Sequence, residues 1–301
     1  MSSPTSWACS TACPDAPVRS AGGAATLGAV RSLVVPELIE VEFYRRLAER
    51  TVGRPVAEVV ADDDWFLKGG TTAAGLEAAL VGRSAVAFRR RGKLLLVDFS
   101  GDAGSADEGP TLGLRFGMTG RLVVDGANAI DELIYSSRRD EPIWDRFTLR
   151  YADGSSLRIQ DPRRLGGVQL DPDEERLGAD AATVGAAGLR DLLAGSTAPL
   201  KARLLDQARL AGVGNLIADE MLWRAGLDPV RPAGSLSPAE LRRLHRHLVA
   251  TIRDLVERGG SHTGDLQSSR TRSGLCPRDG APLERRTVGG RTTYSCPVHQ
   301  R

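Results

Sequence analysis

Hydrophobic positions recur with a helical period directly after Pro36. Val41, Tyr44 and Leu47 stand three residues apart and Gly53 follows them, so this pattern predicts a helix over Glu37–Arg50. Beyond it, short runs rich in β-branched residues alternate with Gly, Asp and Asn clusters, as strands alternate with turns. The predicted strands are Val56–Ala61, Ser84–Arg90, Leu94–Phe99, Thr111–Phe116, Arg121–Val124, Phe147–Tyr151 and Ser156–Ile159. Short strands with such turns predict a sandwich or barrel-like domain.

The period becomes helical again from Ala186, after a linker-like stretch at Asp171–Asp180. Ser237, Pro238 and Glu240 have the spacing of a capping box with proline at the first helical position. The helix that they begin is predicted to end at a Gly-Gly pair. Its apolar stripe consists of Leu241, Leu244, Leu248, Ile252 and Leu255. The histidines on this helix, His245 and His247, fit a solvated or packed role better than a metal-binding one.

Residues 1–34 are rich in Ala, Ser, Gly and Thr and show no sustained period, so we expect them to be unstructured. They lack the basic-then-apolar order of a secretory signal. Val35 is the residue that a GTG codon encodes, and GTG can also serve as a bacterial start codon read as Met. Residues 1–35 are therefore either a disordered extension or the result of a mis-assigned start. The second interpretation is favoured, and it leaves Pro36 as the N-terminus once Met is removed.

The composition excludes some classes of protein. The chain is 41% hydrophobic and 26% charged, without an apolar run near the ~20 residues of a membrane span. Residues 195–301 carry 17 Lys+Arg against 10 Asp+Glu, and residues 1–194 carry 23 against 28. A basic C-terminal part suits a polyanionic partner, although Arg242, Arg243 and Arg246 also fit a solvated helix face. Four cysteines are too few for a secreted disulfide scaffold and fit a cytoplasmic protein.

The C-terminal segment has the spacing of a zinc ribbon. Two residues separate Cys276 from Asp279 and two separate Cys296 from His299, with Gly289–Gly290 at a predicted hairpin turn between the pairs. Four cysteines are usual in such ribbons, and carboxylate is the least selective of these ligand types, so we expect a lower zinc affinity. A metal-free hairpin is the alternative. One structural Zn²⁺ is favoured because a segment of about 30 residues rarely folds stably without a cross-link such as a metal or a disulfide.

Two of three shorter motifs suit phosphate. Gly212–Asn215 predicts a glycine-bracketed turn that opens a helix, whose free backbone N–H groups favour an anion, although a plain interhelical turn also fits. Arg291 follows the hairpin glycines, where the tip could press it against a phosphate. Lys93 enters an apolar strand, and most such lysines merely solvate a strand edge.

Two further motifs would suit a distorted duplex. Asp161–Gly166 places two arginines before an apolar residue, which could clamp a phosphate and wedge a base step. Phe116–Gly120 predicts a tight turn that presents Met118. For Met118 and Leu165, taken singly, core filling is the better interpretation.

In their order along the chain, Pro36–Glu40 and these motifs resemble the formamidopyrimidine-DNA glycosylase and endonuclease VIII-like family of base-excision-repair enzymes. The resemblance spans Pro36 to Arg301, and its specificity lies in the ordered set, since several motifs are weak alone. It implies an α+β fold with an N-terminal two-layer β-sandwich domain, a helical domain with a helix–two-turn–helix, and a C-terminal β-hairpin zinc ribbon. The corresponding ranges are 36–170, 186–262 and 270–301, with a linker at 171–185.

The resemblance also implies a chemistry. Pro36 resembles the nucleophile that attacks C1′ of the damaged nucleoside, and Glu37 resembles the acid that assists base loss and ring opening. Lys93 looks like the residue that serves the lyase step and contacts phosphate. Proline's secondary amine would form an iminium, which acidifies C2′ and permits β-elimination and then δ-elimination. A nearby cation such as Lys93 would help to keep that amine neutral. This chemistry requires no redox cofactor or catalytic metal.

The same resemblance places a set of residues at DNA. Asn215 and Arg291 look like the clamp on the phosphate of the flipped nucleotide, with Arg291 counted among the catalytic residues. Met118, Arg163 and Leu165 match the positions that fill the void and wedge the duplex. Arg164 and Lys201 complete the expected DNA-binding set. The expected partner is damaged double-stranded DNA, bound by a monomer at the bacterial nucleoid in the cytoplasm.

The chain departs from the family pattern at several positions. Ile39 replaces a second proline, Arg115 stands where histidine is common, and Leu165 stands where a phenylalanine often wedges. Only Ser261–Leu275 separates the long helix from Cys276, where glycosylases specific for 8-oxoguanine carry a longer base-capping loop. We therefore expect 8-oxoguanine not to be the chief substrate. Formamidopyrimidines, oxidised pyrimidines and abasic sites remain open.

Two other functions compete with the enzyme. A non-catalytic protein that binds damaged DNA would keep the DNA-binding residues while its proline stays blocked behind the N-terminal segment. A zinc-ribbon RNA-binding module is the third interpretation, but it leaves Pro36 and Glu37 unexplained.

Overall fold

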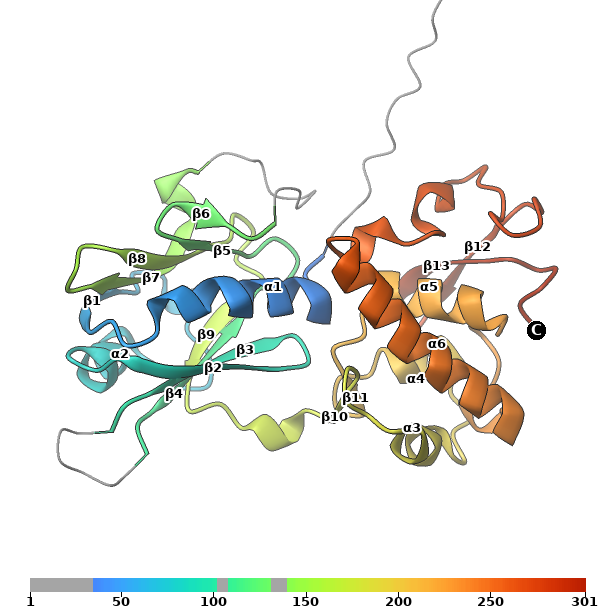
Figure 1. Ribbon diagram of the computed structural model, residues 1–301, viewed down its shortest axis with the longest axis horizontal. Coiled ribbons are helices and arrows are strands. Elements are labelled where there is room, and N and C mark those ends of the chain that lie inside the picture. The colour runs from blue at the N-terminus through green and yellow to red at the C-terminus, as the bar shows by residue number, and fades with distance from the viewer. Residues whose placement is uncertain (1–34, 102–107, 131–139) are drawn as a thin grey trace, which may run out of the picture. The chain divides into compact units, whose positions relative to one another are not determined.

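The computed structural model describes residues 35–101, 108–130 and 140–301 (Figure 1). The expectation that residues 1–34 are unstructured, or wrongly assigned to the chain, lies outside the described residues. None of the described helices is both long and apolar enough to cross a membrane.

Two antiparallel sheets form the N-terminal part. One has the strand order β1-β7-β8-β5-β6 and the other β2-β3-β4-β9. The five strands of the first sheet are β1 Val56–Val60, β5 Arg121–Val124, β6 Ala127–Asn128, β7 Asp145–Tyr151 and β8 Ser156–Gln160. The second sheet holds β2 Ala85–Arg91, β3 Leu94–Phe99, β4 Thr111–Arg115 and β9 Gly167–Leu170. The predicted strands and the α+β fold are confirmed, because each predicted run overlaps one of these strands.

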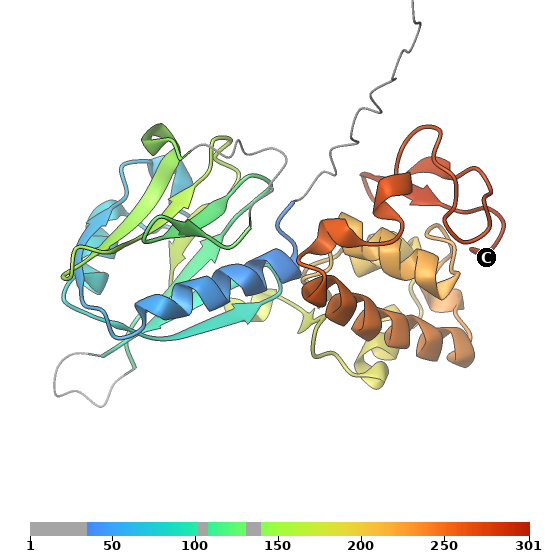
Figure 2. The same cartoon turned by 45° about the horizontal axis from the view of Figure 1, so that its top comes forward.

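Helix α1, Leu38–Ala48, packs between these sheets and contacts β2, β3 and β5 (Figure 2). Val41, Tyr44 and Leu47 recur with a helical period and therefore lie on one face of this helix. All three belong to the buried core that both sheets share. The ring of Tyr44 lies 4.5 Å from that of Phe116. The predicted helix is confirmed, and its packing fixes the residues before it, Pro36 and Glu37, at one end of the sandwich.

Helix α2 and strand β9 are among the elements that escaped the sequence pattern. Helix α2, Ala73–Leu80, is short and begins at Thr72, whose hydroxyl accepts a hydrogen bond from Gly75 N at 3.0 Å. Only Leu76 and Leu80 of this helix are buried, too few to reveal a period. Strand β9 has only four residues, and its pairing with β4 places it in the sheet.

The second half is helical, with α3 Ala186–Leu193, α4 Leu200–Leu204, α5 Asn215–Ala225 and α6 Pro238–Glu257. The predicted capping box at Ser237 and Glu240 is present, and the Ser237 hydroxyl accepts from Glu240 N at 3.3 Å. A parallel pair of two-residue strands, β10 Ala179–Asp180 and β11 Leu210–Ala211, precedes the turn into α5. The stripe residues Leu244, Leu248, Ile252 and Leu255 are buried, which confirms the predicted core face of α6.

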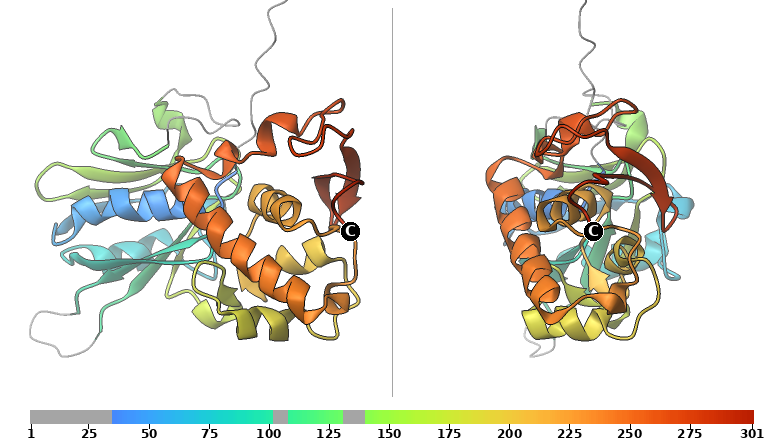
Figure 3. Two further views of the ribbon diagram at one scale, coloured as in Figure 1. Left: turned by 45° about the vertical axis from the view of Figure 1, so that its right-hand side comes forward. Right: turned by 90° about the vertical axis from the view of Figure 1, so that its right-hand side faces the viewer.

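The C-terminal hairpin consists of β12 Glu284–Val288 and β13 Arg291–Ser295. Gly289 and Gly290 form its tip with φ of 57° and 72°, a conformation that favours glycine. Strand β13 contacts α5, and α5 contacts α6 (Figure 3). The hairpin therefore lies on the helix that opens at Asn215.

Candidate active site

The carboxylate of Glu37 lies at the N-terminus of α5. Its Oε1 accepts from Leu216 N at 2.8 Å and its Oε2 from Ile217 N at 3.2 Å. The carboxylate therefore occupies the position where the first turn of a helix has free N–H groups. A Cβ on Gly214 would stand 2.1 Å from Cδ of Glu37, so only glycine fits there.

Burial raises the pKa of Glu37, since the side chain is 1% exposed, and the nearby Glu40 also raises it. The positive charge of Lys93 and the two backbone donors lower this pKa but do not reverse the shift. A carboxyl group with a raised pKa is suited to hold a proton near neutral pH, as a general acid must.

Pro36 directly precedes this carboxylate and is buried. Leu38, two residues further along, donates from its backbone N to Gly212 O at 3.2 Å, so the start of α1 is bound to the glycine turn before α5. In the chain as given, Val35 precedes Pro36, and the proline nitrogen is an amide nitrogen. Nucleophilic chemistry at this nitrogen requires cleavage of the bond between residues 35 and 36, or initiation at residue 35 followed by removal of the methionine.

Glu40 is a second buried carboxylate that sequence reasoning did not select. It accepts from Glu37 N at 2.9 Å and from Ser261 N at 2.7 Å. It therefore joins the first turn of α1 to the segment that follows α6. Burial raises its pKa, against the effect of these hydrogen bonds. Its position at the third residue of a helix is the capping-box signal that could have identified it.

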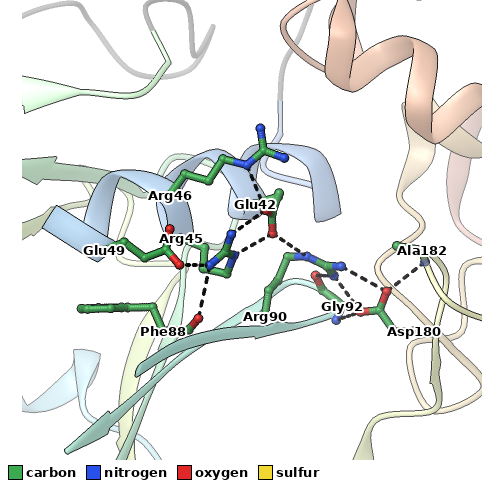
Figure 4. A network of polar contacts seen from close by, with 9 residues as sticks. All are labelled: Glu42, Arg45, Arg46, Glu49, Phe88, Arg90, Gly92, Asp180 and Ala182. Atoms are coloured by element: carbon green, nitrogen blue, oxygen red, sulfur yellow. Dashed lines mark hydrogen bonds and ion pairs between the residues drawn. The ribbon is translucent and has the colours of Figure 1, made fainter. Parts of the chain in front are cut away.

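The turn at Gly92 brings Lys93 to the same place. Gly92 has φ 58°, and a Cβ on it would meet Ala211 Cβ at 2.7 Å and Gly212 N at 3.0 Å. Asp180 holds this turn, because it accepts from Gly92 N at 2.6 Å and pairs with Arg90 at 2.7 Å (Figure 4). The two glycine turns therefore pack directly against each other.

The ammonium of Lys93 is under opposing influences. Burial lowers its pKa most, and the positive charge of Arg291 lowers it further, whereas Glu37 and Glu40 raise it. The structure therefore brings Lys93, Glu37 and Arg291 within electrostatic range, although they come from three distant parts of the sequence.

Asn215 connects α5 to the hairpin. Its Nδ2 donates to Thr292 O at 3.1 Å, directly beside Arg291 at the start of β13. Arg291 is exposed, so its guanidinium is accessible to a ligand. The arrangement places the side chain of Asn215 and that of Arg291 at one end of α5.

Lys201 does not have the geometry of a direct DNA contact. Its side chain is fully buried, and its Nζ pairs with Asp219 at 2.6 Å and donates to Thr293 Oγ1 at 2.7 Å. Asp219 also pairs with Arg270 at 2.9 Å. Since an uncompensated buried charge is costly, this network holds β13 against α4 and α5. The sequence gave no sign of this burial, which depends on residues 18 and 92 positions away.

The turn at Met118 and the arginine loop are joined through Asp161. The buried carboxylate of Asp161 accepts from the hydroxyl of Thr119 and from Gly166 N at 2.8 Å. Gly117 has φ 56°, and a Cβ there would lie 2.5 Å from the backbone of Leu165. Met118 and Leu165, which are 47 residues apart in sequence, therefore lie on adjoining turns.

The exposed side of this loop fits a contact surface. Leu165 is 48% exposed, and Arg163 and Arg164 are exposed as well. Arg164 has φ 56° and pairs with Asp63. Because Leu165 is not part of the core, core filling does not account for it. Met118 is partly buried, so its burial does not distinguish core filling from a contact with DNA.

The four predicted metal ligands come together. One donor atom from each of Cys276, Asp279, Cys296 and His299 lies within 4.8 Å of all the others. Trp223 supports the cluster in two ways: its Nε1 donates to Cys276 Sγ at 3.3 Å, and its carbonyl lies 3.2 Å from His299 Nε2. The second contact leaves Nδ1 of the histidine for the cluster, the arrangement typical of a metal-bound histidine. The donor set thus fits a metal such as Zn²⁺.

Two family models match the chain. The model of the formamidopyrimidine-DNA glycosylase N-terminal domain matches residues 35–168, and that of the formamidopyrimidine-DNA glycosylase H2TH domain matches residues 177–267.

Curated relatives and solved structures agree with these matches. A formamidopyrimidine-DNA glycosylase of Thermus thermophilus is 36% identical over 294 residues, covering 88% of this chain and 98% of that protein. One from Nocardia farcinica is 33% identical over 303 residues, with coverage of 87% and 97%. The Lactococcus lactis Fpg in complex with DNA containing N7-benzyl-Fapy-dG has a TM-score of 0.73 at 26% identity, covering 88% of this chain and 100% of that one. The Thermus thermophilus MutM (Fpg) structure has a TM-score of 0.70 at 34% identity, with coverage of 88% and 98%.

Proposed function

The chain belongs to the formamidopyrimidine-DNA glycosylase family, and we propose that it removes oxidised bases from duplex DNA and cleaves the resulting abasic strand. The observation that carries this proposal is the placement of the Glu37 carboxyl, with its raised pKa, between Pro36, Lys93 and the N-terminus of α5. The bacterial relatives and a DNA substrate favour a location in the cytoplasm.

The proposed reaction begins at the nitrogen of Pro36, freed as an N-terminal amine. This nitrogen bonds to C1′ while the bond from C1′ to the damaged base breaks. The base leaves with the electron pair and takes up a proton, and the proline nitrogen loses its own proton. Glu37 gives a proton to O4′ as the sugar ring opens, which leaves an iminium between proline and C1′. Removal of a C2′ proton, a step that Lys93 serves, then breaks the C3′–O bond and releases the 3′ phosphate.

We propose that Asn215 and Arg291 hold the phosphate beside the flipped nucleotide. The amide of Asn215 has two N–H donors and uses one on Thr292 O, so one remains for a phosphate. A base inside a duplex is inaccessible at C1′, which requires flipping. Met118 and Leu165, on turns joined through Asp161, would fill the space that the base leaves, and Arg163 and Arg164 would contact the strands. Lys201 is better assigned to positioning the hairpin than to binding DNA.

One structural Zn²⁺ is the proposed occupant of the Cys276, Asp279, Cys296 and His299 cluster. Bound there, it would cross-link the segments that flank the hairpin and so contribute folding free energy. With the flanking segments held together, strand β13 is fixed in place, and so is Arg291 at its start.

The preferred lesion is proposed from the segment between α6 and Cys276. It forms two short turns, Ser261–Thr263 and Gln267–Ser269, which leave little chain to cap a large purine. Solved Lactococcus lactis complexes contain DNA with a formamidopyrimidine derivative and DNA with an oxidised pyrimidine. We propose these two lesion classes, together with abasic sites, as better substrates than 8-oxoguanine. A lesion panel in which 8-oxoguanine reacts fastest would refute this proposal.

Borohydride trapping on abasic-site DNA tests the mechanism, because borohydride reduces an iminium to a stable covalent adduct. A protein that starts at residue 35, read as Met, is compared with one that starts at Met1. We expect only the shorter protein to be trapped, and Pro36→Gly to weaken or relocate the adduct. Mass spectrometry of the mature N-terminus checks that Pro36 is exposed.

If neither protein is trapped while both bind abasic DNA, the chain is a damaged-DNA-binding protein and not an enzyme. The amide nitrogen of Pro36 in the chain as given is the observation that favours this second candidate. Glu37→Gln is expected to slow base release, and Glu58→Gln, an exposed surface substitution, serves as its control.

A further inference from the structure

A cationic pocket lies at the end of α5 that is opposite Asn215. It has a volume of about 410 Å³. Arginines from α5, α6 and the segment around the hairpin line it, namely Arg224, Arg243, Arg278 and Arg301, together with His299 and one carboxylate, Glu240. We call it the knuckle pocket, after the metal-ligand pairs beside it.

Two elements separate this pocket from the candidate active site. Helix α5 leads from Asn215 to Ala225, and 11 residues at about 1.5 Å each span about 16 Å. Strand β13 leads from Arg291 to Ser295, and five residues at about 3.3 Å each span a similar length. The proposed phosphate clamp lies at the first residue of both elements, whereas the pocket lies at the last turn of α5 and past the end of β13.

The positive charge at this pocket is only partly neutralised. Arg224 is paired with Glu220, Asp254 and Asp265. Arg278, by contrast, stacks on Trp223 at 4.9 Å, and no carboxylate within the described ranges lies at ion-pair distance from it. The nearest carboxylate to Arg243 is Glu240 at 4.0 Å, which already pairs with Arg231 at 2.7 Å.

The pKa of the neighbouring His247 is lowered by burial and, in part, by the positive charge of these arginines. Burial lowers its pKa most, and the positive charges of Arg246, Arg224, Arg278 and Arg243 lower it further. These arginines therefore act on one small region of the surface. Because like charges repel, a further anion bound beside Arg243 and Arg278 would lower the electrostatic free energy of this region.

We propose that the knuckle pocket binds an acidic segment of a partner protein. Guanidinium groups bind carboxylates through paired hydrogen bonds, and here they surround one hollow. A duplex presents rows of phosphates along a rod, which would suit a row of cations better than a single hollow. The small residues Ala225 and Gly226 also line the pocket, and the exposed Val298 immediately precedes His299 in sequence.

The test uses the full chain with its metal and a fluorescein-labelled hexa-aspartate peptide. Fluorescence anisotropy gives the Kd for the wild type, for Arg243→Glu and for Arg278→Glu. Each variant is expected to weaken binding about tenfold, the loss of one charge-assisted contact. Arg190→Glu, on the exposed surface of α3, makes the same change in net charge and should leave the Kd within about twofold.

A second arm adds an abasic duplex. We expect the duplex not to displace the peptide, and Arg243→Glu to retain duplex binding and strand cleavage. Arg278 lies in sequence between two proposed metal ligands, Cys276 and Asp279, so the metal content of Arg278→Glu is measured as well. Arg243 lies on α6, away from these ligands in sequence, and needs no such check. If the duplex displaces the peptide, or if Arg190→Glu weakens it as much as Arg243→Glu does, the proposal is wrong. Neither result depends on whether Pro36 is catalytic.

Discussion

The carboxylate of Glu37 accepts a hydrogen bond from the backbone nitrogen of Leu216 at 2.8 Å, across 179 residues of sequence. This contact joins the first turn of α1 to the first turn of α5. Because Glu37 is also the proposed acid, the same hydrogen bonds that join the two halves of the chain orient the reactive carboxyl group. Substitutions that disturb this contact should therefore affect both stability and catalysis.

Gly214→Ala tests the close approach at this contact. A Cβ would lie 2.1 Å from Cδ of Glu37, so the carboxyl group must move away from Leu216 N. We expect strand cleavage of abasic DNA to fall about 100-fold, since misplacement by about 1 Å can cost that much. Gly185→Ala is the control, because nothing lies within 4 Å of a Cβ there. Equal activity of the two variants would show that the position of Glu37 is not critical.

Thr119→Val tests the link between the Met118 turn and the arginine loop. The substitution removes one of three donors to the buried carboxylate of Asp161, which keeps those from Arg163 N at 3.1 Å and Gly166 N at 2.8 Å. A hydrogen bond to a charged group contributes about 1.5–3 kcal/mol. We expect a lower free energy of unfolding in urea and weaker binding of a duplex with an abasic site. Thr287→Val, exposed on β12, should change neither quantity. A lower free energy of unfolding without weaker DNA binding would show that the arginine loop does not contribute to DNA recognition.

Lys201→Met tests the buried network under the hairpin. The substitution leaves Asp219 with Arg270 as its remaining ion-pair partner, and breaking a buried pair typically costs about 3–5 kcal/mol. We expect faster amide exchange along β13 and a loss of trapping that follows the displacement of Arg291. A paired Lys201→Met and Asp219→Leu variant should recover part of the stability. Unchanged exchange in β13 together with weaker DNA binding would instead favour a direct contact by Lys201.

Glu240 gives a pH-dependent prediction. Its hydrogen bond with Arg231, and then those with Ser237, lower its pKa from 4.5 to about 2. A lowered pKa in the folded state means that the stabilisation is complete above pH 4.5 and is lost as the pH falls toward 2. The difference in unfolding free energy between wild type and Glu240→Gln should therefore be constant near neutral pH and shrink below pH 4.5. A difference that stays constant down to about pH 2 would contradict the assignment.

The metal cluster makes a prediction about affinity. We expect about one zinc per chain by mass spectrometry of the native protein, and its loss in Cys296→Ala. Asp279→Cys should bind zinc more tightly in a chelator competition, because thiolate is a softer ligand than carboxylate. Trp223, which donates to Cys276, should report metal removal through its fluorescence. A protein that keeps its fold and binds no zinc at micromolar concentration would favour the metal-free hairpin.

The sequence by itself determined the local elements and the types of chemistry. A helical period placed α1 and α6, β-branched runs placed the main strands, and the Ser237 capping box placed the start of α6, because these signals depend on neighbours in sequence. The spacing of Cys276 and Asp279 from Cys296 and His299 was sufficient to predict a shared cluster. Short elements such as α2 and β9 were missed because their burial depends on distant contacts.

Only the tertiary structure decided which of these residues act together. Glu40 and Lys201 are buried by residues remote in sequence. In the same way, Asp161 joins the Met118 turn to the arginine loop, and the Gly92 turn packs against the Gly212 turn. Burial also set the direction of the pKa shift of Glu37, because desolvation outweighs the hydrogen bonds and the nearby positive charge. Desolvation and close packing arise from the assembled chain, and no local pattern encodes them.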